Sequence, residues 1–218
     1  MSGIEVFQDM ALTGPFNERK SLAGALKQSA AVPWIFDETG SKNAEDNANG
    51  DVGILIFLHN GEADLPAARL VLWPDAEGFY VPNITPTATD NLTIAQYNAL
   101  LSNFADVIAR PIARRFGYVV NLTSARQNLE DWMSEEAATA LRRFSASANK
   151  STGASHPLDE RRWFDFIIAV HRAHDDVGTD RLARWLHEVE SWTQETAHDL
   201  AGEFERGLAL LTREVETR

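Results

Sequence analysis

The residue types best suited to chemistry gather in a polar segment, residues 145–157, and in the helix that is predicted to follow it. The segment reads SASANKSTGASHP and contains no apolar side chain larger than alanine. A run rich in Ser, Thr and Gly that enters a helix offers backbone N–H groups to an anion at the positive end of the helix dipole. The sequence therefore predicts an anion-binding loop and helix at 145–162. The side chains that would contact the anion are Lys150, Ser151, Thr152, Arg161 and Arg162.

A plain surface connection is the alternative interpretation of this loop. A phosphate-binding loop has glycine before a Gly-Lys-Ser/Thr tripeptide that follows a strand, whereas Lys150 precedes Gly153 and follows a predicted helix. Ser147 and Lys150 match the Ser-x-x-Lys pattern of serine acyl-transferases, but the second motif of those enzymes lies far away in sequence and here would share Lys150. Neither pattern predicts an enzyme class, and both interpretations of the loop stay open.

Three histidines are the candidates for proton transfer: His156, His171 and His174. His171 and His174 are three residues apart on a predicted helix, so they share a face and could hold a metal with Asp175 or His156. The His-Glu-x-x-His pattern is absent. A helix C-terminus is also a common place for histidine, because the negative end of the helix dipole lies there. We therefore expect no metal site, and catalysis by these histidines is a hypothesis.

The composition narrows the function further. The chain has 218 residues and no cysteine, which excludes disulfides, zinc–thiolate sites, iron–sulfur ligation and thiol nucleophiles and fits a reducing compartment. It begins without a signal-peptide pattern, and its longest clean apolar run, residues 54–58, is far shorter than the roughly twenty residues that span a bilayer. A dinucleotide-binding glycine pattern is also missing. The sequence predicts a cytoplasmic protein with no membrane contact and no cofactor.

The charge of the chain is acidic and unevenly distributed. The formal net charge is −12, which opposes general binding to nucleic acid, because duplex affinity depends mainly on Lys and Arg at phosphates. Residues 1–91 carry 13 acidic and 5 basic side chains, whereas residues 110–172 carry 10 basic and 7 acidic ones. The acidic part is electrostatically complementary to a basic protein partner.

Residues 1–90 have the pattern of a β-rich portion. Apolar alternation and turn residues predict an antiparallel meander of about four strands and one short helix, with residues 4–10 as an exposed edge strand. Residues 37–51 are poor in apolar side chains and rich in Asn, Asp, Glu and Gly. Such a segment cannot bury enough apolar surface to order itself, so we expect a mobile acidic loop there.

Residues 91–218 have helical periodicity instead. Thr93 and Gln96 form a capping-box pattern before apolar residues at helical spacing. Residues 163–170 carry apolar side chains around most of a helix, which predicts the centre of the core. The two portions together predict an α+β fold, with a meander and about five C-terminal helices packed as one compact unit.

Three functions are compatible with these patterns. The leading hypothesis is an acidic protein-interaction module that binds a basic surface, in the manner of an immunity protein or an antitoxin. The alternative is an enzyme or sensor that binds a phosphorylated small molecule or a nucleic-acid end at 145–162, with His171 or His174 transferring a proton. The third is a homo-oligomeric module built on the long C-terminal helix. The first is favoured because it needs no catalytic signature, and we find none in the sequence.

Overall fold

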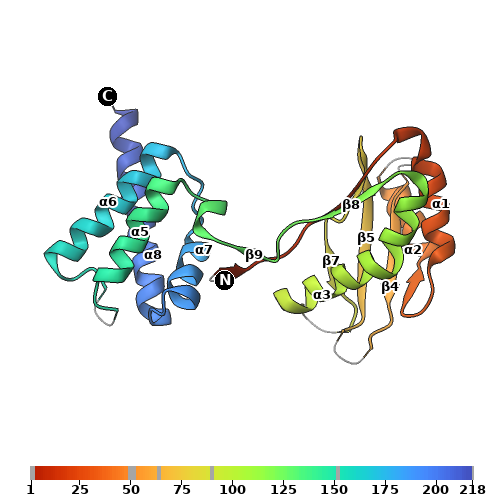
Figure 1. Ribbon diagram of the computed structural model, residues 1–218, viewed down its shortest axis with the longest axis horizontal. Coiled ribbons are helices and arrows are strands. Elements are labelled where there is room, and N and C mark those ends of the chain that lie inside the picture. The colour runs from red at the N-terminus through yellow and green to blue at the C-terminus, as the bar shows by residue number, and fades with distance from the viewer. Residues whose placement is uncertain (1–2, 49–52, 63–64, 89–90, 151–152, 218) are drawn as a thin grey trace. The chain divides into compact units, whose positions relative to one another are not determined.

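The chain folds into two compact units, each of which has its own core. We call residues 6–125 the sheet unit, and residues 1–5 with 126–218 the helical unit. The predicted α+β class is confirmed, since most strands lie in the N-terminal half and most of the long helices lie in the C-terminal half (Figure 1). This computed structural model describes residues 3–48, 53–62, 65–88, 91–150 and 153–217.

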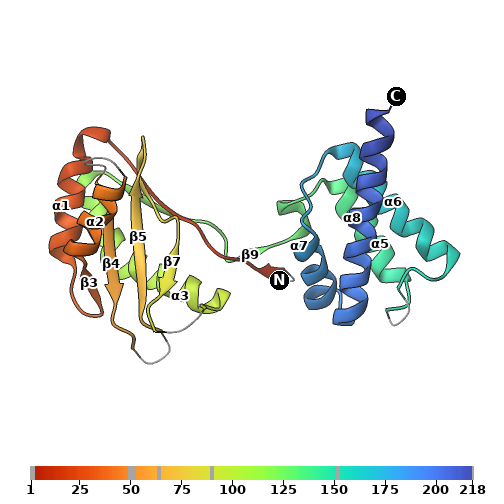
Figure 2. The same ribbon diagram turned by 180° about the vertical axis from the view of Figure 1, so that it is seen from behind.

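An antiparallel sheet forms the framework of the sheet unit. Its strands are β2 (Met10–Thr13), β3 (Trp34–Phe36), β4 (Leu55–His59), β5 (Ala68–Pro74), β6 (Gly78–Tyr80), β7 (Ile84–Pro86) and β8 (Val119–Leu122). They are ordered β3-β4-β5-β6-β2-β8, and β7 pairs with β5 on the side away from β4 (Figure 2). Residues 4–10 do not form the single edge strand that the sequence predicts. Ile4–Glu5 form a short separate strand, β1, residues 6–9 belong to no strand, and Met10 begins β2, which lies between β6 and β8. The ends of the strand order are β3 and β8.

The helices of the sheet unit come from both sides of the predicted boundary at residue 90. They are η1 (Phe16–Glu18), α1 (Arg19–Ser29), α2 (Glu38–Asn47), α3 (Ile94–Phe104), the π-helical η2 (Ala105–Ala109), α4 (Arg110–Ala113) and η3 (Arg114–Phe116). The predicted capping box of Thr93 and Gln96 begins α3. Phe104, at the end of α3, packs its ring against Trp34 and Phe57 at centroid distances of 5.1 and 5.0 Å. The apolar face of α3 therefore completes the sheet core, and the division between the units falls at residue 125.

Helix α2 occupies most of the segment in which a mobile acidic loop is predicted. Asp37 is its N-cap, and Asp37 Oδ1 accepts a hydrogen bond from Gly40 N at 2.8 Å. The buried Ser41 Oγ donates to the Asp37 carbonyl at 2.7 Å and accepts from Ile56 N at 2.9 Å. The loop prediction is wrong for residues 38–47, because a cap and a buried hydroxyl compensate for the scarcity of apolar contacts. Residues 49–51 lie outside the described residues.

The helical unit consists of a short strand pair and a group of packed helices. The strands β1 (Ile4–Glu5) and β9 (Arg126–Gln127) pair with each other. The helices are η4 (Leu129–Asp131), α5 (Glu135–Ser147), α6 (Pro157–Ala173), α7 (Thr179–Arg184), the π-helical η5 (Trp185–Val189) and α8 (Gln194–Glu216). Both α5 and α8 pack against α6.

Aromatic side chains make the core of the helical unit. Phe144 of α5 stacks on Trp192 with ring centroids 5.3 Å apart, and its ring lies 4.8 Å from that of Trp163 on α6. Trp192 Nε1 donates a hydrogen bond to the buried Ser145 Oγ at 2.7 Å, which satisfies its polar atom inside the core. These contacts connect α5 and α6 with the segment just before α8.

The helix predicted to lie at the centre of this core is α6, and one of its aromatic residues is not buried as that prediction requires. Trp163 and Phe166 are fully buried, and Phe166 stacks on Phe204 of α8 at 5.5 Å. Phe164, in contrast, is 49% exposed. The helix therefore buries one face and presents the other to solvent. Over the residues that the structure describes, no helix has the length and apolar content needed to cross a membrane.

Candidate functional site

The helical unit has a groove between α6 and α8, with a volume of about 800 Å³. We call it the α6–α8 groove. Its residues on α8 recur every three or four positions, so they form one stripe along the helix. The lining residues are Gly153, Ala154, Ser155, Glu160, Phe164, Glu195, Thr196, Asp199, Leu200, Glu203, Arg206, Gly207 and Leu210.

A close approach of the two helices sets the depth of the groove. A Cβ atom placed on Gly207 would lie 3.0 Å from Ile167 Cδ1 and 3.2 Å from Ile167 Cγ2. The missing side chain thus lets Ile167 of α6 pack directly on the backbone of α8. Side chains on either side of this contact rise above it as the walls of the groove.

Carboxylates dominate the charge of the groove. Glu160 comes from α6, and three acids one turn apart come from α8, against a single guanidinium, that of Arg206. The three acids of α8 are Glu195, Asp199 and Glu203. No ion pair between described residues neutralises any of these carboxylates. The groove therefore carries an excess of negative charge that is open to a cationic partner.

Apolar side chains lie among these charges. Phe164 is 49% exposed on the α6 side, and Leu210 is 72% exposed on the α8 side. In the described part of α8, no residue after Phe204 is buried. The second half of α8 thus presents apolar surface that this chain does not cover in its own helical unit.

Two of the five predicted anion-binding side chains, Lys150 and Arg162, contact groups of their own unit. Lys150 Nζ donates to the Glu190 carbonyl and lies 5.9 Å from the centroid of the Trp192 ring. Arg162 Nη1 donates to Asp159 Oδ1 at 2.6 Å. Arg161 is exposed. Ser151 and Thr152 lie outside the described residues.

The three candidate histidines are divided between the two ends of α6. His156 is the N-cap of this helix, and its Nδ1 accepts from Leu158 N at 3.2 Å. His171 lies in the last turn and His174 is the C-cap in a left-handed conformation with φ 56°. A helix of this length extends about 25 Å, so His156 cannot share a ligand with the other two.

The described residues at the C-terminal end of α6 likewise do not form a site for a shared metal ion. The rings of His171 and His174 have centroids 6.4 Å apart. Asp175 Oδ2 accepts hydrogen bonds from Ser134 N and Ser134 Oγ at 2.9 and 2.8 Å, so this carboxylate holds the N-cap residue of α5. Within the described ranges, no three histidine or acidic side chains are placed to hold a metal ion.

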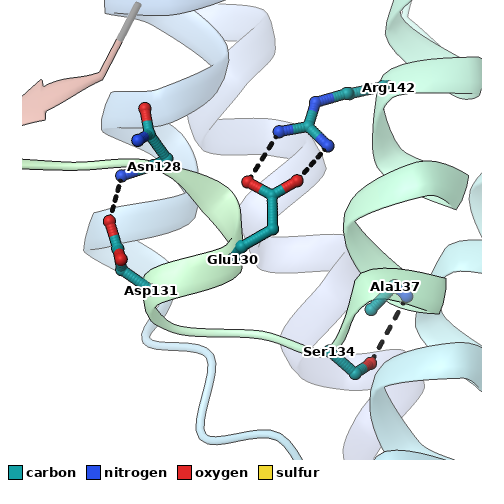
Figure 3. A network of polar contacts seen from close by, with 6 residues as sticks. All are labelled: Asn128, Glu130, Asp131, Ser134, Ala137 and Arg142. Carbon is teal, nitrogen blue, oxygen red and sulfur yellow. Dashed lines mark hydrogen bonds and ion pairs between the residues drawn. The ribbon is translucent and has the colours of Figure 1, made fainter.

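A bidentate ion pair fixes η4 to α5 (Figure 3). Arg142 Nη1 donates to Glu130 Oε1, and Arg142 Nη2 donates to Glu130 Oε2 at 2.8 Å. The hydrogen bonds from Arg142 lower the pKa of Glu130 from its ordinary value of 4.5 to about 2. Asn128 and Asp131 close a capping box at the start of η4, beside this pair. The contacts position the first turn of the helical unit, which is a structural role.

The sequence did not predict a site at the α6–α8 groove. Its two walls come from segments about thirty or more residues apart, and periodicity does not show which helices pack together. One signal was present in the sequence. Glu195, Asp199 and Glu203 recur every four residues and predict an acidic stripe on one helix face.

Comparisons of the chain with protein-family models, with curated proteins and with solved structures found no match. The proposals below therefore depend on the residues and geometry of this chain.

Proposed function

We propose that this chain is an acidic protein-interaction module whose α6–α8 groove binds a basic amphipathic helix of a partner protein. The observation that carries the proposal is the combination of four carboxylates with the half-exposed Phe164 in one groove. An amphipathic helix that lays its apolar face into a groove between helices is a common mode of peptide recognition. The module would inhibit or sequester its partner in the manner of an immunity protein or an antitoxin.

The dimensions of the groove support a helical occupant. The groove follows α8 from Glu195 to Leu210, which at the helical rise is about 22 Å, or about four turns. A partner helix of that length would place apolar side chains over Phe164 and Leu210. Exposed aromatic residues that become buried at the centre of an interface often dominate binding energy, so we expect Phe164 to be the anchor.

The charges of the groove support a basic occupant. Lys and Arg side chains on the flanks of the partner helix would meet Glu160, Glu195, Asp199 and Glu203. Complementary charges of this kind accelerate association and select against acidic partners, and salt weakens both effects. The chain contains no cysteine, so a reducing compartment does not alter it, and we place the interaction in the cytoplasm.

Anion binding at residues 145–162 has less support than this proposal. Lys150 Nζ already contacts the Glu190 carbonyl, and Arg162 is paired with Asp159. An anion would have to compete with these partners for both cations.

The test is a binding titration with a designed peptide. The probe is a fluorescent helical peptide of about four turns, built from leucine and lysine with leucines at helical spacing. Its anisotropy is measured as the chain is added. We expect saturable binding that weakens as salt is raised, and no binding of the same peptide with glutamate in place of lysine. A scrambled leucine–lysine peptide that has no apolar face should bind more weakly than the amphipathic one.

Neighbouring residues on the same helices provide matched controls. Glu203→Lys should weaken binding about tenfold, which corresponds to about 1.4 kcal/mol. Glu205→Lys makes the same charge change on an exposed residue outside the groove and should have little effect. Equal losses in the two variants would show binding by net charge alone and would overturn the proposal.

The apolar contribution is tested in the same way. Phe164→Ser should weaken binding of the amphipathic peptide. Leu158→Ser is the control, because Leu158 is 57% exposed on the same helix but lies outside the groove, and it should leave binding unchanged. A concentration-dependent dimer that excludes the peptide would show that a second copy fills the groove, and would also overturn the proposal.

A further inference from the structure

Strand β8 is an edge of the sheet that carries neither a charged side chain nor a proline. It stands at the end of the strand order, and its outer side has no neighbour among the described strands. Native edge strands are commonly protected from pairing with other chains by a charged side chain, a proline or a bulge. The sequence of β8 is Val-Val-Asn-Leu, which contains no charge and no proline, and Val119 is 58% exposed.

The unpaired backbone groups of β8 can be assigned from its register. Asn121 faces Ala11 of β2, and Thr123 N, further along, donates to the Asp9 carbonyl at 3.0 Å. Backbone groups alternate in direction along a strand, so the odd-numbered residues bond toward β2. The N–H and C=O groups of Val120 and Leu122 consequently point away from β2, to the outer side.

A small cationic pocket adjoins this edge. It has a volume of about 220 Å³ and is lined by Arg110, Ala113, Arg114, Tyr118, Val119 and Val120. Arg110 is paired with Asp106. Arg114 is exposed and forms no ion pair with a described residue. The guanidinium of Arg114 is therefore available to a carboxylate at this edge.

We propose that β8 binds an extended acidic segment of a partner protein by strand addition. The partner backbone would pair with Val120 and Leu122, and one of its Asp or Glu side chains would enter the pocket beside Arg114. In this mode of recognition, backbone hydrogen bonds supply affinity and pockets for alternate side chains supply specificity. Arginine suits the pocket because its planar guanidinium binds a carboxylate through two hydrogen bonds.

The chemistry of the edge selects this occupant over two others. A second copy of β8 offers no carboxylate to the pocket, because residues 117–125 contain no acidic side chain. A nucleic acid lacks the alternating N–H and C=O groups that a strand edge requires. This site lies on the sheet unit and takes an acidic ligand, so it is separate from the groove proposed above, which takes a basic one.

The test uses the whole chain and a short capped peptide that alternates valine and glutamate. We expect saturable binding by fluorescence anisotropy and slower amide hydrogen exchange at Val120 and Leu122 when the peptide is bound. A peptide that alternates valine and lysine should not bind. The valine–glutamate peptide with N-methyl groups on the amides that face β8 keeps every side chain but loses its donors, so it should bind at least about tenfold more weakly.

Two variants test the contributions of the pocket and of the strand edge to binding separately. Arg114→Glu should abolish binding, while Arg115→Glu makes the same charge change next to the pocket and should have little effect. Val120→Pro removes one outward donor while leaving the bonds to β2, and should weaken binding at least about tenfold. Circular dichroism and the retained hydrogen-exchange protection of β4 and β5, which lie in the same unit as β8, show that each variant is folded.

Three results would overturn the proposal. The first is binding of the N-methylated peptide as tight as that of the parent, which would exclude backbone pairing. The second is equal loss in Arg114→Glu and Arg115→Glu, which would indicate attraction by general charge. The third is protection of the Val120 and Leu122 amides through a dimer of the chain without peptide.

Discussion

Glu130 has an unusual acidity for a half-exposed carboxylate. Arg142 holds both of its oxygens and lowers its pKa to about 2, from 4.5 in an unpaired state. The pKa is lower in the folded chain than in the unfolded chain, so the pair stabilises the fold above about pH 4.5 and loses this contribution as the pH falls toward 2. Solvent screens a pair that is 46% exposed at the carboxylate, so we expect a contribution of less than about 1 kcal/mol.

The pKa itself is the measurable quantity. Carbon-detected NMR titration of the Glu130 carboxyl should give a midpoint near 2, and Arg142→Gln should raise it toward 4.5, because both hydrogen bonds are lost. Arg143→Gln is the control, since it removes a neighbouring charge without breaking the pair. An ordinary Glu130 pKa in the parent chain would contradict the bidentate geometry.

Gly78 is a second residue at which the structure makes a sharp prediction. Its φ is +150°, and a Cβ there would lie 2.1 Å from the Leu12 carbonyl oxygen and 2.7 Å from Tyr118 Cε1. Gly78→Ala should therefore lower the free energy of unfolding by about 2 kcal/mol or more, as measured in urea.

The matched control is Gly24→Ala in α1, where a Cβ meets no atom within 4 Å. There the change should raise stability by about 0.5–1 kcal/mol, because alanine favours a helix over glycine. A Gly78→Ala variant as stable as the parent would show that β2 and β6 do not approach as closely as described.

At the scale of the secondary-structure elements, the groove depends on the contact between helices α6 and α8. Gly207→Val would push a branched side chain into Ile167, because a Cβ on Gly207 would already lie 3.0 Å from Ile167 Cδ1. We expect a loss of about 1–3 kcal/mol of unfolding free energy and weaker binding of the basic helical peptide, because the helices must separate.

The matched control is Gly202→Val, about one and a half helical turns before Gly207 on the same helix. The nearest heavy atom to its Cβ position is Arg206 Nη1 at 3.9 Å, so Gly202→Val introduces the same helix propensity without the contact. The difference between the two variants in thermal unfolding isolates the α6–α8 packing. No difference would contradict that packing.

Local sequence signals predicted individual elements better than their partners. The Thr93 and Gln96 capping box begins α3 as expected, because both hydrogen bonds are local. Helix α2 was not predicted, since its stability depends on a hydrogen bond between Ser41 and Ile56, which lies in strand β4. The same limit applies to the α6–α8 groove. Its acidic stripe is visible in the sequence, whereas the position of Phe164 beside it results from packing between distant helices.

At the scale of the whole molecule, the two units have separate cores and opposite proposed ligands. The core of the sheet unit is centred on Phe104 with Trp34 and Phe57, and that of the helical unit on Phe144 with Trp163 and Trp192. Separate cores can lose stability separately. The change of periodicity near residue 90 does not mark this division, because it reflects the type of element and not its packing.

Hydrogen exchange measured by mass spectrometry tests this separation. Gly78→Ala should speed exchange in β2, β6 and the helices of the sheet unit, while α5, α6 and α8 keep the protection of the parent chain. Gly207→Val should have the converse effect. Loss of protection throughout the chain in both variants would indicate one cooperative unit.

The most direct test of the proposed function is an NMR titration of the labelled chain with the basic helical peptide. The proposal predicts saturable shift changes at Phe164, Leu200 and Leu210 and at the acids of α8, with the sheet unit unchanged. Shift changes spread over acidic residues of both units, without a cluster at Phe164, would contradict it.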